Sequence, residues 1–154
     1  MKTFEELLVE LQKCEVRYIL VGGLAVDYAG FHRSTMDVDI IIDADHDNVK
    51  KLLSVLERFG DGYASELSPE DFPLEEGSVR VVEDFPVDIF TQMRGELYGD
   101  LQKYVQLSPT SLGIDIPHLS PQGLILLKET STRNKDIIDV LEMKRIIAER
   151  DAAD

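Results

Sequence analysis

Several features are scarce in this sequence of 154 residues. Tryptophan is absent and Cys14 is the single cysteine, so no intramolecular disulfide can form. Cys14 ends an apolar helical stretch, which favours a packing role. No segment reaches the ~18 apolar residues of a membrane span, and the start, Met1 to Glu6, lacks the apolar core of a signal peptide. We therefore expect no membrane partner and a reducing, cytoplasmic setting.

Positive charge is also scarce. The chain has 16 Lys and Arg against 30 Asp and Glu, which gives a formal net charge of −14. Proteins that bind DNA or RNA by themselves usually have the opposite balance, so stand-alone nucleic-acid binding and an acidic membrane surface are disfavoured. Nucleotides are not excluded, because a divalent metal can bridge carboxylates and phosphates. The length favours one domain.

Hydrophobic periodicity predicts helices and strands in a mixed order. Thr3 and Glu6 fit a capping box at the start of the first helix, and Ser120 with Pro121 marks another helix start. Asp45 is expected to cap a third helix. Further helices are predicted at 24–29 and 134–149, strands at 17–21, 37–42, 79–82, 87–90 and 102–107, and a solvated, mobile acidic loop at 61–76.

This order predicts an α+β fold, in which a mixed β-sheet is flanked by helices. Residues 1–118 would form the core, and residues 119–154 a C-terminal helical extension packed on it. On the last helix, Ile137, Leu141 and Ile147 are expected to be buried.

The most informative part of the sequence is Gly22-Gly23 followed by Asp37-Val38-Asp39. Two glycines after an apolar strand let the backbone turn sharply and approach a ligand closely. The two acids are two residues apart on a predicted strand, so both point to one face. Met36 and Val38 point to the other face, where they can pack.

Two neighbouring carboxylates repel each other, and their burial is costly without a counter-ion. Mg²⁺ or Mn²⁺ compensates such a pair well, because hard cations prefer carboxylate oxygens. Asp88, within Val87-Asp88-Ile89-Phe90, is the strand-centred acid available as a third ligand. A plain strand end in water is the alternative explanation for these acids.

Gly22-Gly23, a spacer of thirteen residues and then Asp37-Val38-Asp39 resemble the signature of the polymerase-β-type nucleotidyltransferase superfamily. The segment from Tyr18 to Ile42 resembles its small bacterial and archaeal branch, which includes abortive-infection-type nucleotidyltransferases. Asp88 falls where that family carries its third carboxylate. A second segment, near the C-terminus, resembles the family's Arg-x-Lys-Asp helix. It consists of Lys128, then Arg133-Asn134-Lys135-Asp136, and Asp139.

The resemblance implies a nucleotidyltransferase fold and a metal-dependent reaction. A nucleoside monophosphate would pass from a nucleoside triphosphate to an acceptor, with pyrophosphate as the leaving group. Mg²⁺ or Mn²⁺ would be the cofactor, and the acceptor could be a small molecule, a protein or an RNA end. The implied catalytic and metal-binding residues are Asp37, Asp39 and Asp88, and the implied nucleotide-binding residues are Gly22, Gly23, Arg33, Thr35, Lys128, Arg133 and Lys135.

One position departs from the family pattern. Members with Gly-Ser place a hydroxyl on a phosphate oxygen, whereas Gly23 offers only its amide. The basic residues must then contribute more to phosphate binding. Asp136 and Asp139 could orient these cations or merely cap the helix.

Other readings of the sequence remain open. The main alternative is a non-catalytic nucleotidyltransferase-like module, because little chain is left for an acceptor-binding domain. Such a module could be half of a toxin–antitoxin pair, or a regulatory subunit with a small protein partner. Haloacid-dehalogenase phosphatases and metal-dependent glycosyltransferases also use Asp-x-Asp, but in other sequence contexts. His32, His46 and His118 are expected to be exposed, and Tyr18 and Tyr28 are expected to pack rather than to stack on a base.

Overall fold

A six-stranded mixed β-sheet lies at the centre of the computed structural model, which describes residues 3–60 and 62–153. Four residues lie outside the described ones, namely Met1, Lys2, Asp61 and Asp154. The predicted domain ranges include all four, and the predicted acidic loop includes Asp61. The sheet order is β3-β4-β2-β1-β8-β7, and β5 and β6 form a separate hairpin. The strands are β1 (Tyr18–Val21), β2 (Val38–Ile42), β3 (Ser78–Val82), β4 (Pro86–Phe90), β5 (Gln92–Met93), β6 (Glu96–Leu97), β7 (Val105–Pro109) and β8 (Asp115–Leu119).

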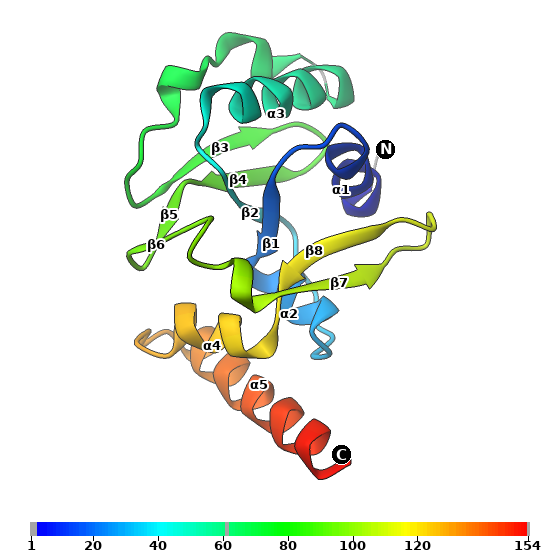
Figure 1. Ribbon diagram of the computed structural model, residues 1–154, viewed down its shortest axis with the longest axis vertical. Helices are drawn as coiled ribbons and strands as arrows, with labels where there is room; N and C mark the ends of the chain where they lie inside the picture. Colours follow the sequence, from blue (N-terminus) through cyan, green and yellow to red (C-terminus); the bar gives the residue numbers. More distant parts are fainter. Residues whose placement is uncertain (1–2, 61, 154) are drawn as a thin grey trace.

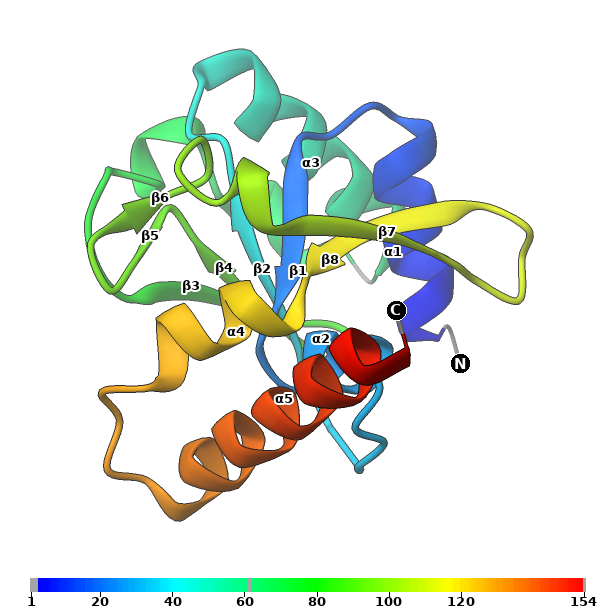
Figure 2. The same cartoon turned by 60° about the horizontal axis from the view of Figure 1, so that its bottom comes forward.

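Helices pack around this sheet in two groups. Helices α1 and α3 contact each other on one side, whereas α4 and α5 pack together at the opposite end of the molecule (Figure 1). Figure 2 shows α5 lying alongside α4 and close to α2. The helices are α1 (Phe4–Lys13), α2 (Gly22–Tyr28), α3 (His46–Phe59), α4 (Pro121–Lys128) and α5 (Asn134–Ala153), with short 3₁₀ helices η1 (Tyr63–Glu66), η2 (Pro69–Asp71) and η3 (Gln102–Tyr104). The predicted α+β fold with C-terminal helices is therefore confirmed.

The strand order places β4, β2, β1 and β8 in the interior of the sheet. Strand β2 is antiparallel to β1 and parallel to β4. Strand β8 is parallel to β1, and the edge strands β3 and β7 are antiparallel to their neighbours. Within the described residues, no helix is both long and apolar enough to cross a membrane.

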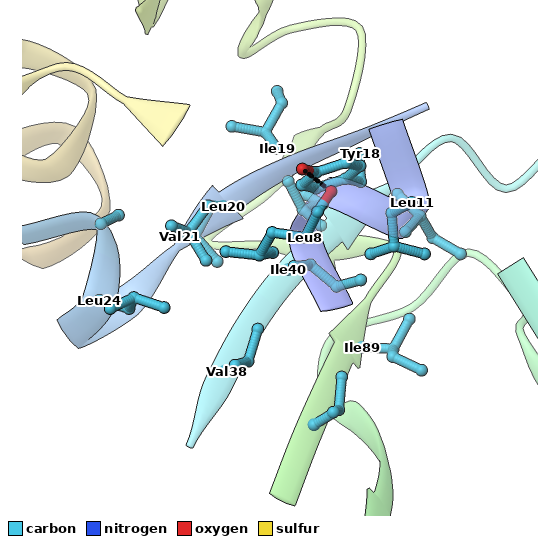
Figure 3. Packing of buried hydrophobic residues seen from close by; sticks show 14 of the residues in the cluster. Leu8, Leu11, Tyr18, Ile19, Leu20, Val21, Leu24, Val38, Ile40 and Ile89 are labelled. Atoms are coloured by element: carbon cyan, nitrogen blue, oxygen red, sulfur yellow. Dashed lines mark hydrogen bonds between the residues drawn. The ribbon is translucent and has the colours of Figure 1, made fainter. Parts of the chain in front are cut away.

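Apolar side chains of β1, β2 and β4 pack against α1 in the core. Figure 3 shows Leu8 of α1 close to Tyr18, with Ile40 and Ile89 on the neighbouring strands. The Tyr18 ring is 2% exposed, and its hydroxyl donates a hydrogen bond of 2.9 Å to the carbonyl oxygen of Leu8. The predicted packing role of Tyr18 is confirmed, and burial raises its pKa.

Two of the three predicted helix caps form. The Thr3 hydroxyl accepts from the Glu6 amide at 3.2 Å, with the reciprocal bond in place, and Ser120 caps α4 at the Gly123 amide. Asp45 precedes α3 but makes no side-chain cap bond, so that prediction is wrong. Its carboxylate instead pairs with Arg17 at 3.5 Å.

The prediction of an exposed His118 is also wrong, because no strand was predicted where β8 forms. His118 lies in that strand and is fully buried. Its Nδ1 lies 2.9 Å from the Leu119 carbonyl oxygen and its Nε2 lies 2.6 Å from Ser108 Oγ. Burial lowers the pKa of His118. His32 and His46 are exposed, as predicted.

Helix α5 presents a different face to the core than its apolar residues suggest. Ile137 and Leu141 are 43% and 61% exposed, although we predicted both to be buried. Asp136 and Asp139 point inward instead, because they bind cations of the neighbouring elements.

Met36, just before β2, was expected to pack in the core but is exposed.

The predicted strand at 102–107 begins later than expected, because 3₁₀ helix η3 precedes β7. Within the predicted acidic loop, residues 62–76 contain η1 and η2, and buried Phe72 anchors the segment to the core. Its described acidic residues are all exposed, which agrees with a solvated surface.

We expect Tyr18→Phe to lower the free energy of unfolding by about 1 kcal/mol, because it deletes a buried hydrogen bond and keeps the ring. Tyr28→Phe is the matched control, since its hydroxyl bonds Glu5 in a half-buried setting where water can replace it. Urea unfolding measures both variants. Equal losses would contradict the role assigned to the Tyr18 hydroxyl.

Candidate functional site

Strand register brings the three predicted aspartates together. Asp39 of β2 pairs directly with Asp88 of the parallel strand β4, and Asp37 immediately precedes β2. Directly paired residues on neighbouring strands point to the same face. One carboxylate oxygen of each aspartate lies within 4.8 Å of the other two. No other group of three His, Cys, Asp or Glu converges in this way among residues 3–60 and 62–153.

Gly22 allows the turn between β1 and α2 to lie against this cluster. Its φ is +74°, a left-handed conformation that favours glycine. A Cβ at Gly22 would overlap the Asp39 carboxylate and lie 2.8 Å from the Asp39 Cβ. Both the backbone conformation and the close approach therefore require glycine here.

Asp39 has an unusual electrostatic environment. Burial is the largest cause of the rise in its pKa, to about 7, and the negative charges of Asp37 and Asp88 add to it. Lys128 acts in the opposite direction. The cluster therefore carries negative charge that the surrounding residues do not fully compensate, which suits a cation-binding site.

Arg80 contacts the aspartate cluster directly, and the sequence analysis missed it. It pairs directly with Asp88 across β3 and β4, and its Nε and Nη2 donate to the two Asp88 oxygens at 2.8 Å each. Nη2 also lies 3.4 Å from Asp37 Oδ2. The lone cation in Val79-Arg80-Val81-Val82 was a usable signal, but its strand partner could not be read from the sequence.

Buried Asp139 links the predicted cations. Its side chain is 1% exposed and accepts two bonds from Arg33, at 3.0 and 2.8 Å. Lys128 Nζ lies 3.1 Å from Asp139 and donates to Asp136 at 3.0 Å. Bonds from Ser131 and Lys128 lower the pKa of Asp136, although burial opposes them. These two acids therefore orient Arg33 and Lys128.

Arg33 and Thr35 fill the space beside Gly23. A Cβ at Gly23 would lie 3.2 and 3.3 Å from the Arg33 guanidinium nitrogens and 3.3 Å from Thr35 Oγ1. The Thr35 hydroxyl donates to the Asp37 carbonyl oxygen at 3.2 Å. A serine side chain at this position would crowd these groups.

One pocket of about 490 Å³ collects the whole predicted set. Every residue predicted to bind metal or nucleotide lines it. Lys128 lies on α4, whereas Arg133 and Lys135 lie at the start of α5. The pocket also includes residues that the sequence analysis did not single out, among them Glu76, Arg80, Phe90, Met93, Arg94 and Leu124.

A mixed sheet with a glycine turn and aligned aspartates on neighbouring strands defines the nucleotidyltransferase class of α+β proteins. The chain belongs to the DUF6036 family, described as "Nucleotidyltransferase of unknown function", whose model matches residues 1–152. It is therefore a nucleotidyltransferase by family and by fold.

Solved structures share the fold. The lincosamide antibiotic adenylyltransferase LnuA, in its lincomycin-bound structure, has a TM-score of 0.62 at 21% identity, covering 94% of this chain and 98% of that chain. A candidate nucleotidyltransferase, TM1012 from Thermotoga maritima, has a TM-score of 0.53 at 17% identity, covering 97% and 87%. None of the curated proteins matches the sequence significantly.

The raised pKa of Asp39 predicts a pH-dependent gain from Asp39→Asn in metal-free buffer. The pKa is about 7 in the folded chain against an ordinary 3.8, so the folded state holds a proton more tightly and stability falls as pH rises between these values. We expect the variant to gain about 1–3 kcal/mol at about pH 8 and a smaller amount at about pH 5, where Asp39 of the folded chain keeps its proton and only the unfolded chain has begun to lose it.

Urea unfolding at the two pH values measures this difference, and exposed Asp151→Asn is the control. An equal gain at both pH values would show that the charge of Asp39 is not the cause.

We expect Gly22→Ala to lower the free energy of unfolding by more than about 2 kcal/mol, because alanine disfavours the positive φ and overlaps Asp39. Gly99→Ala is the matched control, since a Cβ there meets nothing within 4 Å. Thermal unfolding compares the two. A Gly22 variant as stable as the Gly99 variant would rule out the required close approach.

Proposed function

We propose that this nucleotidyltransferase transfers a nucleoside monophosphate from a nucleoside triphosphate, with Mg²⁺ or Mn²⁺, to a hydroxyl of a small-molecule acceptor. One observation carries the proposal: three converging carboxylates share a pocket with a cluster of cations. Carboxylates suit a divalent metal, and cations suit the phosphates of a nucleotide.

The residues at the carboxylate cluster fit a hard divalent cation. Carboxylate oxygens are the ligands that Mg²⁺ and Mn²⁺ prefer. Asp88 has a side chain only 9% exposed, and the Gly22 turn leaves room for Asp39. When bound, the metal would stabilise the charge on the attacking and leaving oxygens of an in-line displacement.

Cations are concentrated at the pocket, although the protein is strongly acidic. Six of the 16 Lys and Arg residues line it. Arg33 and Lys128 are held by buried Asp139. Within the described part of the chain, the side chains of Arg133 and Lys135 form no ion pair, and Arg133 acts only through its charge on nearby Asp136, so both cations can also face a triphosphate.

The remaining lining suits the rest of a nucleotide. Phe90, Met93, Leu124 and Leu127 give apolar surface for a base or sugar. The free amides at the start of α2, together with Lys128, would hold the phosphate tail. This arrangement leaves the α-phosphate beside the aspartates.

In the proposed reaction, the acceptor hydroxyl oxygen forms a bond to the α-phosphorus. The bond between the α-phosphorus and the oxygen that leads to the β-phosphate breaks, and pyrophosphate leaves with that electron pair. Asp88 takes the proton of the hydroxyl, while Arg133 and Lys135 stabilise the negative charge of the leaving group. Asp37 and Asp39 would hold the metal together with Asp88, which would therefore act both as a metal ligand and as the group that accepts the proton.

The solved structure of LnuA supports a small acceptor. LnuA is described as a lincosamide antibiotic adenylyltransferase and was solved with lincomycin bound, and the alignment covers 98% of its chain. A chain of this length can therefore serve an acceptor that is a small molecule. This comparison also weakens the argument that a chain so short has no room for an acceptor.

The test is calorimetric titration of the protein with ATP, GTP, CTP and UTP, in Mg²⁺ and then in Mn²⁺. We expect metal-dependent binding of at least one nucleotide and its loss in Asp39→Asn. We also expect pyrophosphate release with a suitable acceptor to fall at least about 100-fold in that variant.

Asp151→Asn, an exposed change far along α5, is the control for net charge. Absence of binding by the folded wild type in every combination would favour the non-catalytic module. A small protein partner would then be sought by co-purification, and the proposed cytoplasmic residence would be tested by cell fractionation.

A further inference from the structure

Arg80 occupies the position where the carboxylate cluster needs positive charge. Its guanidinium forms a two-pronged pair with Asp88, at 2.8 Å to each oxygen, and extends to Asp37 at 3.4 Å. A guanidinium fits a carboxylate in this manner because its N–H groups form a planar fork. Arg80 thus occupies both oxygens of Asp88, which are also the oxygens that a metal would require.

The surroundings of the two partners differ greatly. The side chain of Asp88 is 9% exposed, whereas that of Arg80 is 54% exposed. Arg80 also lies on β3, an edge strand of the sheet, so one side of its strand has no neighbour in the sheet. A buried carboxylate requires a counter-ion, but an exposed arginine can swing into water at small cost.

We propose that Arg80 is an exchangeable internal counter-ion, which neutralises the aspartate cluster in the metal-free protein and must release Asp88 before Asp88 can ligate a divalent cation. This inference rests on the proposed function of the same site. Arg80 is a positioning residue here, because it acts on the cluster through Asp88.

The exchange has two consequences for the site. Without metal, the aspartates stay close together because Arg80 offsets part of their repulsion. After release, Arg80 remains at the wall of the pocket that Arg133 and Lys135 also line. The pocket then contains one more uncompensated guanidinium, so metal loading makes it more attractive to an anionic nucleotide.

The experiment compares Arg80→Gln with Arg94→Gln in the whole 154-residue chain. Arg94 lines the same pocket, but its guanidinium bonds Thr130 at 3.3 Å and none of the three aspartates. Both variants remove one positive charge from the pocket. Mn²⁺ affinity, measured without nucleotide by electron paramagnetic resonance, and melting temperature in EDTA are the readouts.

We expect Arg80→Gln to bind Mn²⁺ about tenfold more tightly than wild type, because the competing cation is gone. Its melting temperature should fall in EDTA and recover with Mn²⁺. Arg94→Gln should resemble wild type in both measurements. Arg80→Lys keeps the charge without the fork, so its affinity should lie between those of wild type and Arg80→Gln.

Each alternative result has a distinct meaning. If wild type and Arg80→Gln bind Mn²⁺ equally, or the variant binds more weakly, the proposed exchange is wrong. The metal site of the proposed function would still stand in that case. If Arg94→Gln tightens binding as much, general charge and not Arg80 is responsible, and the exchange is again wrong. If neither wild type nor Arg80→Gln binds Mn²⁺, the metal-dependent function itself fails, and the exchange fails with it.

Discussion

Three like charges held at one point impose the main constraint on this structure. Asp39 and Asp88 are fixed side by side by the parallel register of β2 and β4, and Asp37 adds a third carboxylate. Burial and mutual repulsion raise the pKa of Asp39 to about 7, so the arrangement costs stability when no cation is bound. Arg80 from β3 and Lys128 from α4 compensate part of this cost, and Gly22 at the start of α2 leaves space for the Asp39 carboxylate.

The C-terminal helices are attached to the core through charge as well as through apolar packing. Asp139 is fully buried on α5 and binds Arg33 from the loop before β2 and Lys128 from α4. A buried carboxylate without partners would be strongly unfavourable. The three elements therefore hold one another in place, and this explains why α5 turns Asp136 and Asp139 inward while Ile137 and Leu141 face solvent.

The sequence predicted what depends on local spacing. Acids two residues apart share a strand face, and this rule located Asp37 and Asp39. A hydroxyl residue followed by proline begins a helix, and this rule located the start of α4. It failed where long-range pairing decides. Arg80 becomes a site residue only because β3 pairs with β4, and His118 is buried only because β8 lies between β1 and β7. Apolar periodicity also assigned the wrong face to α5, because it ignores buried ion pairs.

The contrast between the pocket and the rest of the protein bears on the acceptor. The formal net charge is −14, yet six of the 16 cations line a single pocket. A compact anion such as a triphosphate can reach these cations without leaving the pocket, although acidic residues line it as well. A polynucleotide would have to continue beyond the pocket, over a surface that carries the excess of negative charge, and each further phosphate would be repelled. The same charge distribution therefore admits a nucleotide as donor and disfavours a nucleic-acid strand as acceptor, which is the electrostatic reason to place a small molecule first.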